Sequence, residues 1–155
     1  FIRRPRSSFI PVVRLWQTRV RMRVVLDTNV LISACLKPQG LEAQVVRMVL
    51  SGSASLFVTE AILEEYRDVF SRPKFAHFPA QLLADLERLA GEVTPHEAVT
   101  AATDEDDNRF LECAQAAAAD FLITGNLRHY PAEWAGTRIV NARRFLGAVG
   151  CIIEV

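Results

Sequence analysis

The stretch Arg23-Val-Val-Leu-Asp27 decides the fold, because a short, valine-rich apolar run here ends in an acid. Continuous apolar runs of this length are typical of strands buried on both faces of a parallel sheet. Outward from it, similar runs alternate with amphipathic segments, which indicates βαβ units. Further strands are expected at residues 55–58, 121–124 and 138–140, with a short one within 93–102. The sequence therefore predicts an α/β fold, a three-layer α/β/α sandwich around a mainly parallel sheet.

Helices are expected between these strands. Thr28 or Asn29 caps the first, and Thr59 caps a later one that ends near Phe70, since such side chains accept bonds from free helical N–H groups. Helical periodicity predicts that the Asn108 side chain faces solvent. The remaining helices are expected at residues 41–50, 81–90, 104 to about 119, and 142–146.

The composition fits one globular domain, since 50% of the 155 residues are apolar and 23% are charged. No uncharged apolar run reaches the roughly 18–20 residues of a membrane helix, so no membrane partner is expected. The three cysteines are widely spaced and suggest neither a disulfide framework nor a zinc site. A reducing, cytoplasmic location is therefore expected.

The net charge is zero, but two parts of the chain carry opposite charges. Residues 1–21 hold six arginines and no acid, whereas residues 22–155 hold 12 basic and 18 acidic side chains, a net charge of −6. We interpret residues 1–21 as a basic extension that is non-native or disordered, with an arm that touches nucleic acid as the alternative. The folded domain is expected to span residues 22–155.

Three acids fall at positions where a core should be apolar. Asp27 ends the buried strand, and ligands of open parallel sheets bind just beyond the carboxyl ends of strands. Glu65 lies at the margin of an apolar helix stripe centred on Tyr66. Asp107 projects onto the middle of the apolar face of the Ala-rich helix. An acid in such a place is costly unless it binds a cation.

Structural roles compete with this interpretation, since Asp27 alone serves equally well as a helix cap and Glu65 alone as a solvated acid. Asp104 and Asp106 suit the positive end of a helix dipole. Carboxylates gathered together nevertheless repel one another, which a divalent cation relieves. An oxygen-rich set without His or Cys suits Mg²⁺ or Mn²⁺, ions that activate water for phosphodiester hydrolysis.

Four segments together resemble the PIN-domain ribonucleases, in particular the VapC-like branch described as toxin components of toxin–antitoxin pairs. The segments are Val24-Val-Leu-Asp-Thr-Asn-Val-Leu-Ile-Ser33, Ile62-Leu-Glu-Glu-Tyr66, Asp106-Asp-Asn-Arg-Phe-Leu-Glu-Cys-Ala114 and Ala119-Asp-Phe-Leu-Ile-Thr-Gly-Asn126. The resemblance covers nearly all of residues 22–146 and implies a metal-dependent endoribonuclease. A PIN-like sandwich, an RNA substrate and a cognate antitoxin are implied with it, and a homodimer by analogy.

By position, the resemblance assigns the metal ligands to Asp27, Glu65 and Asp107, the same acids that periodicity selects. Asp104 adds a further acid, and Asn29 and Thr124 match polar positions of the site. One departure stands beside these matches: many relatives have Asp where this chain has Asn126. An amide carries no charge, so the alternative is a catalytically weak or inactive PIN-like module that binds RNA or protein.

Other side chains are assigned less chemistry. Arg128, Arg143 and Arg144 are the expected contacts with the RNA backbone, with a solvated face as the alternative. We interpret His129 as a solvated loop side chain, with a phosphate contact at the site as the alternative. Tyr130 and Trp134 are interpreted as a cover of the core, with stacking on a base as the alternative. An acidic pocket also suits capture of an Arg from an antitoxin. A phosphohydrolase with an Asp nucleophile is disfavoured, because Asp27-Thr-Asn lacks a second acid two residues on.

Overall fold

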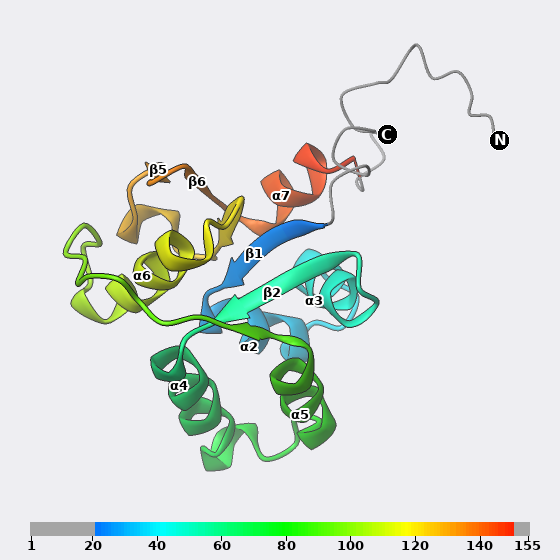
Figure 1. Ribbon diagram of the computed structural model, residues 1–155. Coiled ribbons are helices and arrows are strands. Elements are labelled where there is room, and N and C mark those ends of the chain that lie inside the picture. Colours follow the sequence, from blue (N-terminus) through cyan, green and yellow to red (C-terminus); the bar gives the residue numbers. More distant parts are fainter. Residues whose placement is uncertain (1–20, 151–155) are drawn as a thin grey trace, which may run out of the picture.

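The computed structural model describes residues 21–150, and within them six strands form one sheet in the order β3-β2-β1-β4-β6-β5 (Figure 1). The strands are β1 (Met22–Leu26), β2 (Ala54–Val58), β3 (Gly91–Glu92), β4 (Phe121–Ile123), β5 (Glu133–Trp134) and β6 (Thr137–Val140). Neighbouring strands run parallel except β5, which is antiparallel to β6. The predicted basic extension, apart from Arg21, lies outside the described residues.

Helices flank this sheet and confirm the predicted sandwich. They are α2 (Thr28–Leu36), α3 (Leu41–Leu50), α4 (Glu60–Phe70), α5 (Ala80–Leu89), α6 (Asn108–Ala117) and α7 (Ala142–Ala148). Three 3₁₀ turns, η1 (Pro73–Phe75), η2 (Glu105–Asp107) and η3 (Leu127–His129), join them. Helix α3 contacts α7, and α6 contacts both α4 and the central strands. Within residues 21–150, no helix has the length and apolar character needed to cross a membrane.

Two local predictions about the chain before the acidic cluster need correction. The side chain that caps α2 is that of Asp27, not Thr28 or Asn29, because Asp27 has extended backbone and accepts a bond from the Asn29 N–H. The short strand expected within 93–102 lies earlier, at β3. Gly91 allows the chain to approach β2, since a Cβ there would stand 2.8 Å from the Phe57 ring.

The start of α6 also differs from the expectation. The acidic cluster forms the 3₁₀ turn η2 rather than α-helix, and the helix ends at Ala117 because Ala118 adopts a left-handed conformation. Asn108 is buried, not turned toward solvent, because its Oδ1 accepts a bond from the Ala102 N–H at 2.8 Å. That bond holds the preceding loop against the head of the helix. The short strand β5 was not anticipated at all.

The order of the strands places a crevice at the middle of the sheet. The chain runs from β1 outward to β2 and β3, then returns to β4 on the other side of β1 and continues to β6. The order therefore reverses between β1 and β4, and ligands of open α/β sheets bind at such a switch point. Leu26 and Ile123, the last residues of the two strands, pair with each other and are fully buried. The next residue of each chain segment, Asp27 or Thr124, therefore stands at this edge.

Candidate metal centre

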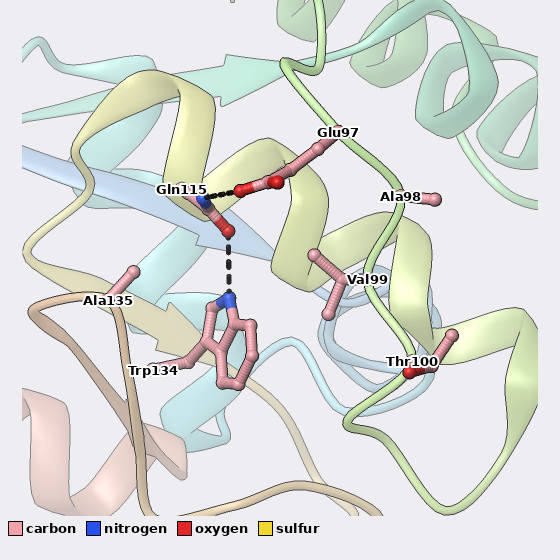
Figure 2. A pocket seen from close by; sticks show the side chains of 7 residues that line it. All are labelled: Glu97, Ala98, Val99, Thr100, Gln115, Trp134 and Ala135. Carbon is pink, nitrogen blue, oxygen red and sulfur yellow. Dashed lines mark hydrogen bonds between the residues drawn. The ribbon is translucent and has the colours of Figure 1, made fainter.

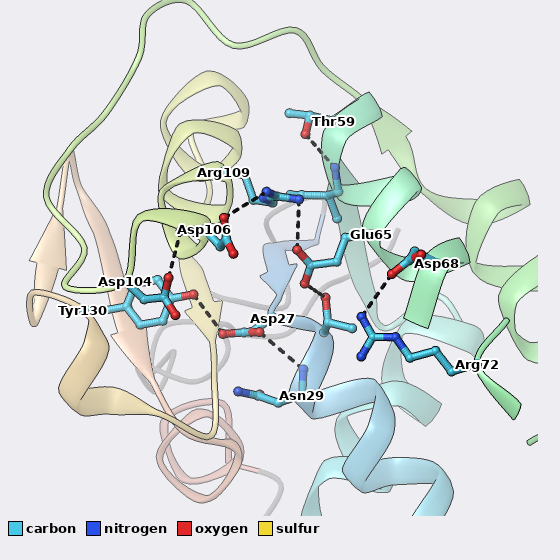
Figure 3. Close-up of polar contacts among 12 residues, drawn as sticks. Asp27, Asn29, Thr59, Glu65, Asp68, Arg72, Asp104, Asp106, Arg109 and Tyr130 are labelled. Carbon is cyan, nitrogen blue, oxygen red and sulfur yellow. Dashed lines mark hydrogen bonds and ion pairs between the residues drawn. The ribbon is translucent and has the colours of Figure 1, made fainter. Parts of the chain in front are cut away.

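Asp27 is held rigidly at the switch point by three donors. Its Oδ2 accepts hydrogen bonds from the Thr124 hydroxyl at 2.9 Å and the Tyr130 hydroxyl at 2.8 Å. Its Oδ1 accepts only a longer bond, 3.3 Å, from the Asn29 N–H (Figure 3). Asp27 is 5% exposed, so the carboxylate is nearly buried. The arrangement fixes one oxygen and leaves the other with capacity for a further partner.

Glu65 reaches the same region from α4, as its marginal position on the helix predicts. One carboxylate oxygen accepts a bond from the Thr28 hydroxyl, and the other pairs with Nη1 of Arg109 at 3.1 Å. Arg109 lies in the first turn of α6, and its Nη2 stands 3.7 Å from Asp106 (Figure 3). A guanidinium of this chain thus partly neutralises the acids.

Asp107 lies at the N-terminal end of α6 and contacts an imidazole. Its Oδ2 is 3.1 Å from Nδ1 of His129, and its side chain is 16% exposed. Carboxylate oxygens of Asp104 and Asp107 and a ring nitrogen of His129 all lie within 4.8 Å of one another. Burial and the negative charge of Asp27 raise the pKa of Asp107, and the bond from His129 opposes this only in part.

These acids share one cavity of about 560 Å³. Asp27, Glu65 and Asp107 all line it, and the basic side chains in its described wall are Arg72 and Arg109. The acids come from the end of β1, from α4 and from the turn η2 before α6, so the cavity exists only once the sheet and these segments have packed. The three acids that sequence periodicity selects are therefore neighbours in the folded chain.

The supporting residues occupy different positions around this cavity. Asn29 lines it and accepts a bond from the Gly125 N–H at 3.0 Å. Thr124 is fully buried behind Asp27, and its hydroxyl also accepts from the Asn126 N–H at 3.0 Å. Asn126 itself is exposed. The supporting contacts therefore tie the turn after β4 to the turn after β1.

The arginines expected to contact RNA, Arg128, Arg143 and Arg144, are exposed, and the described wall of the cavity contains none of them. Arg128 lies in η3, while Arg143 and Arg144 lie in the first turn of α7. Their predicted role with RNA remains a prediction. The two arginines inside the cavity were not singled out by sequence reasoning.

Sequence reasoning missed Tyr130 as a member of the site and favoured a solvated position for His129. Tyr130 does cover the core, being 8% exposed, but its hydroxyl points at Asp27. Burial and the negative charge of Asp27 raise the pKa of Tyr130, so its hydroxyl remains a donor. His129 is half-buried against Asp107 rather than solvated. Their position in the segment that follows β4, a strand that ends at the switch point, was the available signal.

A second cavity, of about 460 Å³, lies along α6 away from the acids (Figure 2). The Trp134 indole N–H donates to Gln115, whose amide donates to Glu97. Gln115 follows Asp107 by about two helical turns, roughly 12 Å along the axis. This wall satisfies its own polar groups and gathers none of the acids described above.

The donor set fits a divalent cation. Asp27 Oδ1 has capacity for a further partner, and the pKa of Asp107 is raised by its burial and then by the nearby carboxylate of Asp27. A cation among these oxygens removes that repulsion, and the oxygens are hard ligands of the kind that Mg²⁺ and Mn²⁺ take.

Comparison with known proteins agrees with this geometry. Residues 23–128 match the PIN domain family. A relative from Methanocaldococcus jannaschii, the uncharacterized protein MJ1680, is 25% identical over 114 residues, which covers 70% of this chain and 73% of the relative. The matched family segment contains most of β1, all of α4 and α6, and every acid in the described wall of the cavity.

Proposed function

The chain belongs to the PIN domain family, and from its acidic cavity we propose that it is a metal-dependent endoribonuclease. One observation carries the proposal. Asp27, Glu65 and Asp107, from three distant segments, line one cavity at the switch point of the sheet. PIN domains are commonly nucleases, and such an acid-rich cavity is the kind of site that hydrolyses phosphodiesters with a divalent ion.

Mg²⁺ or Mn²⁺ would be held by Asp27, Glu65 and Asp107, with Asp104 as a further acid. When bound, the ion supplies water activation and neutralises charge on the scissile phosphate. The chain's own groups prepare this chemistry. Tyr130 and Thr124 fix Asp27 through hydroxyl donors to Oδ2, so its other oxygen keeps a constant orientation. Preorientation of ligands by such contacts raises both metal affinity and activity.

The substrate is proposed to be RNA, bound through its phosphates. Arg72 and Arg109 stand in the cavity wall, and Arg128, Arg143 and Arg144 are exposed beyond it. Arginine binds phosphate oxygens in a planar, bidentate manner, which suits a backbone contact. The net acidity of residues 22–155 makes such local basic groups necessary.

The proposal includes a role as the toxin of a toxin–antitoxin pair. The ion pair of Arg109 with Glu65 supports it, since it shows that a guanidinium can be accommodated among these acids. An antitoxin that inserts an arginine beside Glu65 would block the site in the same way. A homodimer and a cytoplasmic location belong to the same proposal.

The experiment uses a circular single-stranded RNA, which only an endonuclease can open, with the metal-free protein and added Mn²⁺ or Mg²⁺. We expect wild type to cut it, and Asp27→Asn to lose at least about 100-fold in rate, because several kcal/mol of charge stabilisation disappear. Asp68→Asn is the matched control, since Asp68 lines the same cavity but pairs with Arg72 on its exposed side. Equal cutting by wild type and Asp27→Asn would refute the proposal.

A second candidate, a PIN-like module that binds RNA or protein without cutting, is favoured by one feature. The uncharged Asn126 stands exposed where the resemblance to PIN-domain ribonucleases implies an acid, and Arg109 already pairs with one oxygen of Glu65. A titration separates the two candidates. A module of this kind binds RNA equally with and without Mn²⁺ and leaves circular RNA intact at every concentration of the ion.

A further inference from the structure

The backbone of His129 is held in place on two sides. Its N–H donates to the Asn126 carbonyl at 3.0 Å, and its own carbonyl accepts from the Thr103 N–H at 2.8 Å. The second bond joins η3 to the loop directly before Asp104. The backbone of His129 therefore cannot move away from the acidic segment without breaking a contact between two distant parts of the chain.

Three potential ligand atoms converge beside this contact. A ring nitrogen of His129 and carboxylate oxygens of Asp104 and Asp107 lie within 4.8 Å of one another. With metal–ligand bonds of roughly 2.0–2.2 Å, two ligands of one small dication stand at most roughly 4.2–4.4 Å apart, so the three atoms must draw closer together to share an ion. His129 is 36% exposed, which leaves a path for an ion from solvent.

We propose that Asp104, Asp107 and His129 form a mixed nitrogen and oxygen site that takes a first-row transition-metal dication in preference to Mg²⁺. This inference rests on the proposed function and deepens it, because Asp107 belongs to both the cavity and the new ligand set. Mg²⁺ demands oxygen ligands and keeps its water, whereas transition-metal dications accept imidazole readily. The imidazole of His129 would serve as a neutral ligand, and the neighbouring Asn126 side chain adds no charge to the site.

The experiment measures binding of the ions alone to the full chain. Calorimetric titrations with Mn²⁺, Co²⁺ and Mg²⁺ are compared for wild type, His129→Asn and His96→Asn. His96 is the matched control, because it is an exposed loop histidine outside the described walls of the acidic cavity. Nitrogen hyperfine coupling to bound Mn²⁺, recorded by pulsed electron paramagnetic resonance, reports direct ligation.

We expect wild type to bind Mn²⁺ and Co²⁺ more tightly than Mg²⁺ and to show the nitrogen coupling. His129→Asn should weaken Mn²⁺ and Co²⁺ binding by about tenfold or more, leave Mg²⁺ binding within about twofold, and abolish the coupling. His96→Asn should behave as wild type. A wild type without nitrogen coupling, or a His129→Asn variant with an unchanged ratio of Mn²⁺ to Mg²⁺ affinity, would overturn the inference.

This failure is distinct from failure of the proposed function. If wild type cuts circular RNA and Asp27→Asn does not, while nitrogen coupling is absent, only the role of His129 is wrong. If wild type neither binds an ion nor cuts RNA, both proposals are wrong. Thermal unfolding of each variant without metal shows whether a change in affinity reflects a loss of folding.

Discussion

Replacement of Tyr130 by Phe removes one hydroxyl from the site and keeps the ring that covers the core. The hydroxyl donates to Asp27 Oδ2 at 2.8 Å, and both side chains are less than a tenth exposed, at 8% and 5%. The acceptor keeps one other donor, since the Thr124 hydroxyl contacts the same oxygen at 2.9 Å. The perturbation therefore weakens the support of Asp27 without leaving its oxygen empty.

The magnitude follows from the charge and burial of the acceptor. A hydrogen bond to a charged group contributes about 1.5–3 kcal/mol, and the remaining Thr124 donor places this loss at the lower end, about 1.5–2 kcal/mol. For a domain of this size each kcal/mol lowers Tm by roughly 3–4 °C. We therefore expect Tm of the metal-free variant to fall by roughly 5–8 °C. Mn²⁺ affinity should fall by about tenfold or more, as for other groups that orient metal ligands.

The control is Tyr66→Phe. The Tyr66 hydroxyl is fully buried too, but it donates at 2.6 Å to the backbone carbonyl of Leu26, a neutral acceptor. Its loss costs about 0.5–1.5 kcal/mol of stability and should leave Mn²⁺ affinity unchanged. Differential scanning calorimetry in a chelator and titration with Mn²⁺ give both quantities. The reasoning is refuted if Tyr130→Phe keeps Tm within about 2 °C, or if both variants lose the same Mn²⁺ affinity.

Periodicity was sufficient for the parts of the site that lie on regular elements. Asp27 follows a buried strand, and the edge at which it stands is a property of parallel sheets rather than of its neighbours. Glu65 was placed about a quarter turn from the centre of its helix stripe, and its side chain is 23% exposed, as such a position requires. Asp107 was projected onto the apolar face and is 16% exposed.

The residues that periodicity missed owe their positions to contacts between distant loops. His129 is fixed by the bond from Thr103, and no repeat in the sequence relates these two segments. Arg109 looks like a solvated residue of a first helical turn, yet its partner Glu65 lies on another helix. Asn108 is buried for the same reason, since its side chain satisfies a loop N–H. Polar pairings of this kind depend on tertiary packing, which a local pattern cannot encode.

Two further substitutions test the charge balance of the cavity. The pKa of Asp107 in the folded state is raised above its ordinary value of 3.8. The protonated side chain therefore stabilises the folded state at low pH, and this contribution is lost as pH rises through the folded pKa. The stability of Asp107→Asn relative to wild type, measured by urea unfolding in a chelator, should therefore increase from pH 3 to pH 7, and a constant difference would contradict this. Arg109→Ala should increase Mn²⁺ affinity by about 1.5–5-fold, because Arg109 competes with the ion for Glu65. The ion pair of Arg109 with Glu65 that this substitution removes is partly exposed and worth roughly 0.2–1 kcal/mol. Arg72→Ala should not, since Arg72 pairs with the exposed Asp68. Weaker Mn²⁺ binding by Arg109→Ala would mean that the guanidinium supports the carboxylates rather than competing with the cation.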